Sequence, residues 1–328
     1  MTMLRKFLGL SAVVVACGGS GANQPQPTLA SASASASTAS PVTAEQLEKD
    51  PLALFPSGAL GMFAIDAKAF YASQSAGPAA AQLAEKYFPI GSECGFSPSK
   101  DLDRVTGGFY SMQGADVLAT LGGRFDEAKI AAAAQAKTQL HMGGVVVASQ
   151  YAGRTMYTVA DAGFTVLSPH LVLAGTKTTI KRALERIADR HLAHDAPAWM
   201  LQTLATPNAA AALALDTKGM PLTSLTGGFP LKGTDGMTAV RLLANFQPPG
   251  MNVAGAATYS DEAHAKAGAD GLKALSSSTA FTVLTSAVGV TLKDVTITPA
   301  QSDAQIAFKV DDSSLKNLFL RLPSAFGQ

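Results

Sequence analysis

The feature that most constrains the fold is a set of landmarks that occurs twice in the same order. In each half of the chain a proline leads through an apolar run to an aspartate, first over residues 56–66 and later over residues 207–216. An alanine-rich segment then opens with Asp-Glu-Ala in both halves, at Asp126 and at Asp261. Strand-like and helix-like landmarks that recur in one order predict two related halves, produced by an internal duplication.

Both aspartates stand where a helix N-cap belongs, because a carboxylate there accepts backbone N–H bonds and interacts favourably with the helix dipole. After each alanine-rich segment come segments typical of two strands and a closing helix. They lie at Thr155 to Val159, Leu171 to Ala174 and Thr176 to His191 in the first half, and at Val295 to Thr298, Gln305 to Val310 and Ser313 to Leu322 in the second. The first half is longer between its landmarks, which predicts an added helix over Ala79 to Tyr87.

Neither half shows a regular alternation of strands and helices with a glycine fingerprint. We therefore expect an α+β fold of two related halves, each a mainly antiparallel sheet with helices packed on one face. The first half is expected to span residues 51–195 and the second residues 196–328. The chain has 328 residues and is 47% hydrophobic, which is ample material for a core of this size.

The N-terminal stretch has the three parts of a secretory signal. Arg5 and Lys6 form a basic start, an apolar run begins at Phe7, and small residues end it at Ala16. The run is shorter than the roughly 20 apolar residues that a membrane-spanning helix needs. We expect residues 1–16 to be a signal peptide.

The end of this signal, Val14-Val15-Ala16-Cys17, resembles the lipobox of bacterial lipoproteins. The resemblance implies cleavage after Ala16, a thioether-linked diacylglycerol on Cys17 and acylation of the new amino group. Each methylene group of an acyl chain that enters the membrane contributes about 0.8 kcal/mol to membrane binding, and stable anchoring needs more than one acyl chain. We therefore expect the membrane to be a partner through lipidated Cys17; the alternative is an ordinary signal peptide that happens to contain a cysteine. Gly18, in place of the aspartate that marks inner-membrane retention, favours the outer membrane.

The segment after the anchor is low in complexity. It has no charged or aromatic residue from Gly18 to Ser40, and alanine and serine alternate over Ala30 to Ser37. Such a segment cannot bury enough apolar surface to offset the entropy of ordering it. We expect residues 17–50 to be a disordered tether that holds the folded part some 25 Å from the membrane on average.

The charge and the cysteine content argue against nucleic-acid binding and against an intrachain disulfide. The net charge is +1 and would be near −1 once Arg5 and Lys6 are removed, so nucleic acid is not an expected partner. The cysteines are Cys17 and Cys94, and acylation of the first leaves the second without an intrachain partner. We expect Cys94 to be a buried, inert thiol, because the neighbouring charge is the acid Glu93 and not a cation.

The order of these features resembles bacterial envelope lipoproteins whose folded part is a domain of unknown function. The resemblance rests on the anchor cysteine, the spacer, the apolar strand ending in Asp66, the Gly107-Gly108-Phe109 strand and the segment from Gly123 to Ile130. It covers most of the folded region and implies no catalytic residues.

One pair of histidines suggests a metal site. His191 and His194 are three residues apart, with Asp189 and Asp195 beside them, so a continuing helix would place them on one face. The alternative is a solvated helix end whose basic residues suit the dipole. The His-Glu-x-x-His, EF-hand and paired Cys-x-x-Cys patterns do not occur, so we expect no metal and no cofactor.

The remaining motifs are isolated and lack the partners that catalysis needs. They are the Ser-x-x-Lys spacings Ser97 to Lys100 and Ser313 to Lys316, the acidic pairs Asp101 and Asp103 and Asp311 and Asp312, and the glycine pairs at 18–19, 122–123 and 227–228. The serine motifs come without the Ser-Asp-Asn and Lys-Thr-Gly partners, and the glycines without a P-loop lysine. Trp199, at the join of the halves, is expected to pack between them. No catalytic residue is expected.

The leading hypothesis is a non-enzymatic, membrane-anchored lipoprotein that presents a binding or structural surface to another envelope protein. One alternative is a carrier or chaperone for an apolar ligand such as lipid, and another is a hydrolase with an unrecognised site. A deep apolar cavity would favour the carrier. A cleft with converging carboxylates or histidines would favour the hydrolase.

Overall fold

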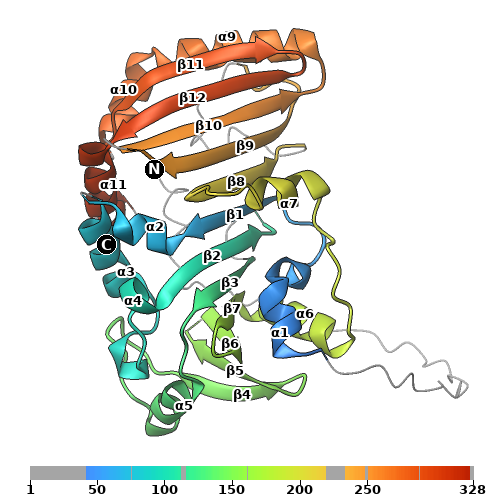
Figure 1. Cartoon of the computed structure of the whole chain (residues 1–328), viewed down its shortest axis with the longest axis vertical. Helices are drawn as coiled ribbons and strands as arrows, with labels where there is room; N and C mark the ends of the chain where they lie inside the picture. The colour runs from blue at the N-terminus through green and yellow to red at the C-terminus, as the bar shows by residue number, and fades with distance from the viewer. Residues whose placement is uncertain are drawn as a thin grey trace, which may run out of the picture.

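The computed structural model describes residues 42–74, 76–111, 116–160, 162–218, 233–247, 250–287 and 289–325. Within these ranges the chain forms one twelve-stranded antiparallel sheet with helices against it (Figure 1). The α+β class and the antiparallel character of the sheet are therefore confirmed. The predicted signal peptide 1–16 and Cys17 lie outside the described residues, as does the glycine pair 227–228.

The sheet has the strand order β11-β12-β10-β9-β8-β1-β2-β3-β7-β6-β5-β4. Its strands are β1 (Gly61–Asp66), β2 (Leu102–Phe109), β3 (Val117–Gly123), β4 (Val147–Tyr151), β5 (Arg154–Val159), β6 (Ala162–Ser168), β7 (Leu171–Thr176), β8 (Ala211–Asp216), β9 (Met237–Phe246), β10 (Gly250–Tyr259), β11 (Leu292–Ala300) and β12 (Asp303–Asp311). The helices are α1 (Ala44–Lys49), η2 (Pro51–Leu54), α2 (Ala67–Ala72), α3 (Gly77–Tyr87), η3 (Ser92–Cys94), α4 (Pro98–Asp101), α5 (Glu127–Ala136), α6 (Lys177–Ala188), α7 (Ala198–Leu204), α9 (Glu262–Ser276), α10 (Thr279–Ala287) and α11 (Asp312–Ala325). The helix expected over Ala79 to Tyr87 is α3.

The two halves repeat one strand order. The first half runs β1-β2-β3-β7-β6 outward from the middle of the sheet, and the second runs β8-β9-β10-β12-β11. The hairpin β4-β5 extends only the first half. The predicted pairing of Thr155 to Val159 with Val295 to Thr298 is therefore wrong, because Thr155 to Val159 belongs to this hairpin and the counterpart of β11 is β6. Asp126 caps α5 and Asp261 caps α9, each accepting the N–H three residues ahead, as the repeated landmarks predict.

The halves meet at an antiparallel pair of equivalent strands. In the β1-β8 register Phe63 lies opposite Leu213, and each stands three residues before the aspartate that ends its apolar run. An antiparallel pair centred on equivalent residues relates the halves by an approximate twofold axis. The duplicated landmarks therefore fold into one continuous sheet.

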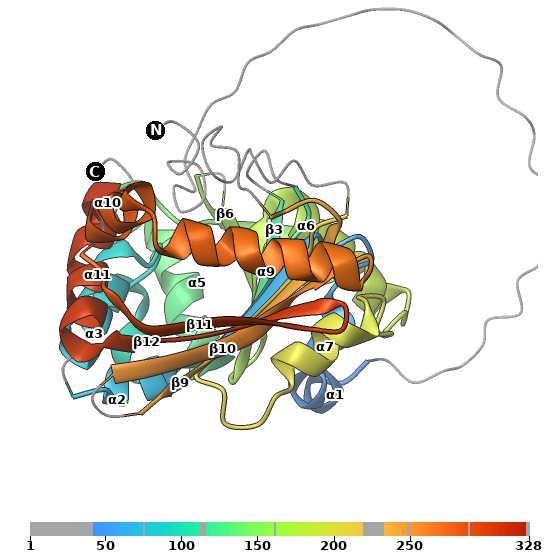
Figure 2. The ribbon, with the colours of Figure 1, turned by 90° about the horizontal axis from the view of Figure 1, so that it is seen from above.

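The placement of the helices differs from the prediction in both halves. In the first half α1 and α6 pack on one face, around Met62, Leu118 and Leu173, while α2 and α5 pack on the other, around Leu121 and Val172. In the second half α9 and α11 lie on one face, but α7 packs on the other, against β8 and β9. In the first half the reason is visible in β6, which is buried along nearly its whole length and so needs cover on both sides. Figure 2 shows α9 on one side of the sheet and α1 and α7 on the other.

The folded part begins earlier than predicted. Residues 44–49, assigned to the tether, form α1, and residues 51–54 form η2. Thr43 and Gln46 form a capping box at the start of α1, and Leu47 is fully buried against the core of the first half. Leu47 thus packs α1 against the core, although the polar composition of this segment predicts that it is exposed to solvent.

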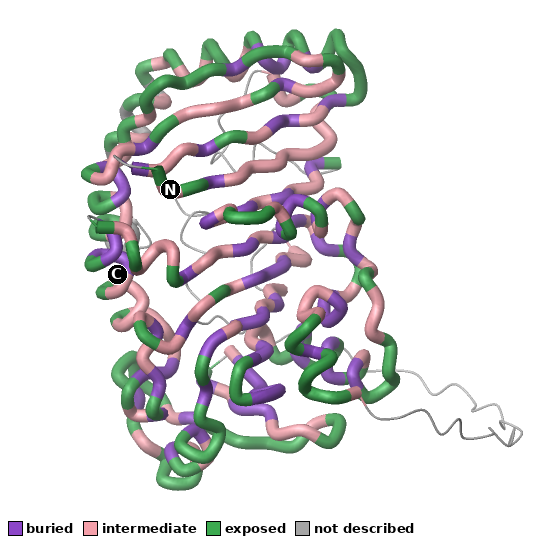
Figure 3. The backbone as a smooth tube through the Cα atoms, viewed as in Figure 1, coloured by how far each residue is buried: buried purple, intermediate pink, exposed green. Residues whose placement is uncertain are grey.

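Buried residues follow the strands of the first half and of the centre, whereas the outer strands of the second half are more exposed (Figure 3). Among the described helices none is both long and apolar enough to cross a membrane.

Candidate functional site

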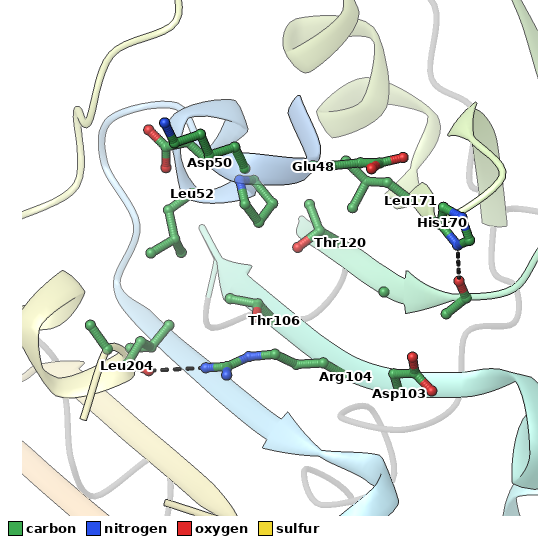
Figure 4. Close-up of a pocket in the computed structure, with 15 residues that line it drawn as sticks. Glu48, Asp50, Leu52, Asp103, Arg104, Thr106, Thr120, His170, Leu171 and Leu204 are labelled. Carbon is green, nitrogen blue, oxygen red and sulfur yellow. Dashed lines mark hydrogen bonds between the residues drawn. The ribbon is translucent and has the colours of Figure 1, made fainter. Parts of the chain in front are cut away.

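A recess of about 560 Å³ opens between α1-η2 and the face of the sheet that α1 covers (Figure 4). Strands β2 and β3 form its floor, the β6-β7 turn one side, and the C-terminal end of α7 the other. It lies directly beside α1, the first helix that the structure describes.

The floor carries two threonines that face each other across neighbouring strands. Thr106 and Thr120 are paired in the β2-β3 register, and their residues are only 6% and 3% exposed. Both line the recess, and neither hydroxyl has a hydrogen-bond partner among the described residues. The alternation of a strand places both on the same face, where directly opposed Cβ atoms lie about 5 Å apart.

The acids around the recess are each held by a different partner. Glu48 accepts a hydrogen bond from Ser168, which ties α1 to β6. Asp50 accepts from His194 Nε2 at 2.8 Å, and Asp103 pairs with Lys68 Nζ at 2.9 Å. These carboxylates serve to dock α1 and α2 and do not converge on one point.

Two basic side chains lie at the ends of the floor. The Arg104 guanidinium donates through Nη2 to the Leu204 carbonyl at 3.1 Å, and His170 Nδ1 lies 3.2 Å from the Gly123 carbonyl. Leu171 and Leu204, both buried, provide apolar wall. The recess is therefore lined by polar and apolar groups together and is not a deep apolar cavity.

The histidines that suggested a metal site are split between two partners. His194 pairs with Asp50, while His191 Nε2 lies 3.5 Å from Asp195. Asp195 is also held by Arg186, and this hydrogen bond lowers the pKa of its carboxyl. Within the described ranges no three metal-ligating side chains come together. Asp189 lies at the C-cap of α6.

The two Ser-x-x-Lys motifs serve as local structure. Ser97 Oγ donates to Glu85 at 2.7 Å, and Ser313 Oγ donates to Asp311 at 2.8 Å, so neither serine meets the lysine three residues on. The acidic pairs are also structural. Asp101 pairs with Arg124 at 3.1 Å, and Asp311 accepts the N–H of Ser314 at the start of α11.

Cys94 and Trp199 lie where the sequence predicts. Cys94 is 1% exposed, and burial raises the pKa of its thiol to about 11, with the Glu93 charge adding to the shift. A thiol with such a pKa is almost wholly protonated at neutral pH and therefore a poor nucleophile. Trp199 on α7 packs against the core that the two halves share.

Sequence reasoning missed the recess residues Thr106, Thr120, Arg104 and His170. None belongs to a motif. The sequence does show a threonine at an inward-facing position of each of two apolar strands. That pattern indicates a site only once the β2-β3 register is known, because the register places the two threonines opposite each other.

The sequence matches no family model and no curated protein. Solved structures of TP0453 are similar at 12% sequence identity. Crystal form III has a TM-score of 0.53 and covers 83% of this chain and 97% of that one; form I has a TM-score of 0.52, with coverages of 84% and 97%. The similarity shows a shared fold.

Proposed function

We propose that this protein is a lipid-anchored component of a bacterial cell envelope, more specifically of the outer membrane, that acts by binding and not by catalysis. The observation that carries the proposal is the state of the acids at the recess. Each of the three carboxylates is committed to a different partner, so the described part of the site lacks the converging acid and base that hydrolysis needs.

The position of the recess supports a role at the membrane surface. Its wall is α1, which begins just after the segment that would join Cys17 to the folded part. Cys17 would fix the site within reach of the membrane, and the remaining sheet would extend away from it as a surface for an envelope protein partner.

The anchor is tested by labelling cells with radioactive palmitate. The wild-type chain should incorporate the label and sediment with membranes, and Cys17→Ala should do neither. Cys94→Ala is the matched control, because it removes the other cysteine and should leave labelling unchanged. Label that persists in Cys17→Ala would disprove the anchor. Saturable turnover of an ester or peptide substrate by the purified protein would disprove the non-catalytic role.

A second candidate, a carrier for an apolar ligand, is favoured by one specific feature. Six large apolar side chains share one face of the central strands, are only half-buried, and belong to none of the described core clusters. This central apolar strip consists of Phe63, Ile65, Phe109, Leu213, Leu215 and Leu242. Native mass spectrometry of the purified protein tests it: a carrier would retain lipid that Leu213→Gln loses, and a lipid-free wild-type protein would exclude this function.

A further inference from the structure

The two floor threonines of the recess have hydrogen-bonding capacity that the protein leaves unused. Thr106 and Thr120 are more than nine-tenths buried, stand opposite each other, and have no partner within the described chain. Both open into the recess, so a molecule seated there would be within their reach.

Arg104, beside them, has unused donors. It uses only Nη2, on the Leu204 carbonyl, which leaves its other N–H groups without a partner in the described residues. His170 donates its Nδ1–H to the Gly123 carbonyl, so the unpaired Nε2 of the neutral ring is an acceptor. The nearby carboxylates of Glu48, Asp50 and Asp103 already have partners. A ligand that pairs with the free N–H groups of Arg104 must therefore bring acceptors.

A glycine keeps the floor open beside Arg104. Gly122 lies opposite Arg104 in the β2-β3 register, and a Cβ at that position would meet nothing closer than 3.8 Å. Its backbone is not in the left-handed region, so a larger side chain is compatible with the strand there. Such a side chain would project into the recess and occupy the ligand's space.

Apart from Lys49 and the backbone of Gly123, the rest of the lining is apolar. Leu171 and Leu204 are buried at the sides, and Leu52 of η2 lies across from the floor (Figure 4). A volume of about 560 Å³ is in the range of small-molecule sites. Leu204 lies beside Arg104 and Leu171 beside His170, so each side of the recess combines a polar group with aliphatic wall (Figure 4).

We propose that the recess binds a small organic carboxylate. Its carboxylate accepts hydrogen bonds from Arg104, Thr106 and Thr120, and its short aliphatic body lies against Leu171 and Leu204. A guanidinium and hydroxyls match a carboxylate because each of its two oxygens accepts more than one bond. The inference rests on the proposed binding function and names the ligand class for its site.

Hexanoate is a suitable probe, and hexan-1-ol, which has the same body without the charge, is its control. Both are titrated by isothermal calorimetry into the full lipidated chain in non-ionic detergent, with empty micelles as the blank. Hexanoate should bind saturably with one site, and hexan-1-ol at least about tenfold more weakly, because only the carboxylate forms charge-assisted hydrogen bonds with Arg104. Equal affinity for the two probes, or no saturable binding of hexanoate, overturns the proposal.

Variants then locate the binding site. Gly122→Val should abolish hexanoate binding, and Arg104→Gln should weaken it by about tenfold or more. Thr106→Val should weaken it by roughly 2- to 10-fold, whereas Thr296→Val on β11, far from the recess, should leave it unchanged. Melting temperatures check that each variant folds. Should Gly122→Val not fold, Thr106→Val and Arg104→Gln still decide the outcome.

Unchanged binding in the folded recess variants would place the carboxylate elsewhere and overturn the proposal. The palmitate and fractionation results on Cys17→Ala do not depend on the recess. Failure of hexanoate binding is therefore distinguishable from failure of the anchored role.

Discussion

The ring of Phe63 lies against Gly107 on the neighbouring strand, so closely that a Cβ on the glycine would come within 2.3 Å of the ring's Cζ. Two residues along, the arrangement is reversed: Phe109 lies against Gly61, with a corresponding distance of 2.3 Å. Each ring occupies the space that a side chain on the opposite strand would take. The two phenylalanines thereby cover the backbone of two strand glycines at the centre of the sheet.

Gly107→Ala is expected to destabilise the protein by about 1–3 kcal/mol, because the new methyl group forces the Phe63 ring out of its place. Gly122→Ala is the matched control: it lies on the neighbouring strand, and its methyl would meet nothing closer than 3.8 Å. Urea denaturation of both variants measures the difference. Equal stability of the two would mean that the Phe63 ring relaxes without cost.

The repeated landmarks allowed much of the fold to be predicted. Asp126 and Asp261 begin helices, and the segments after them are strands, because capping and alternation are local properties that a sequence displays directly. The joining of the halves could not be predicted in this way. Whether Phe63 would pair with Leu213 depends on contacts 150 residues apart, and nothing in either strand specifies its partner.

The recess was missed for a related reason. Thr106 and Thr120 are ordinary strand residues in sequence, and they form a site only because the β2-β3 register opposes them and α1 closes over them. The prediction also began the folded part too late in the chain, since Leu47 is the buried residue of α1 and its burial cannot be read from composition. An inference from composition averages over a segment, so one buried residue such as Leu47 does not change it.

The two halves are expected to unfold together. Met62 on β1, Ala214 on β8 and Met200 on α7 belong to one buried cluster, so the core crosses the boundary between halves. Met200 is fully buried, and Met200→Ala should therefore cost about 2–5 kcal/mol and speed hydrogen exchange in both β7 and β10. Met142→Ala, at a site 46% exposed, should change stability by less than about 0.5 kcal/mol. Faster exchange confined to one half would contradict a shared core.

The Cys94 thiol should not react with alkylating reagents in the folded protein. Its burial and its raised pKa, about 11, leave little thiolate and no access for reagent. In a Cys17→Ala background, iodoacetamide should label Cys94 only after denaturation, whereas an added cysteine at the exposed site, Met142→Cys, should react within minutes under native conditions. Native labelling of Cys94 at a rate comparable to that of the Met142→Cys thiol would show that the loop around η3 opens readily.

Asp311 should make the free energy of unfolding depend on pH in the acid range. Its carboxylate accepts hydrogen bonds from Lys293 Nζ, at 2.8 Å, and from the N–H of Ser314, and these hold its pKa well below the usual range, near 3.9 in an unfolded chain. A carboxyl whose pKa is lower in the folded state stabilises the protein at pH above about 4, and this contribution is lost as the pH falls toward the folded pKa.

Asp311→Asn keeps a capping side chain but removes the charge, so it should lower stability at pH 7 by up to about 1 kcal/mol, the range of exposed ion pairs. The difference from wild type should shrink steadily below pH 4, because the Asp311 carboxyl becomes protonated there in the unfolded chain while it stays ionised in the folded one. Asp311→Ala should lose the cap as well, at a further cost of about 0.5–2 kcal/mol. Asp312→Asn, which removes the adjacent charge without removing a hydrogen bond in the described chain, is the control. Urea titrations from pH 7 to pH 2 measure all four proteins, and a difference between wild type and Asp311→Asn that stays constant over this range would show that the charge of Asp311 contributes nothing to folding.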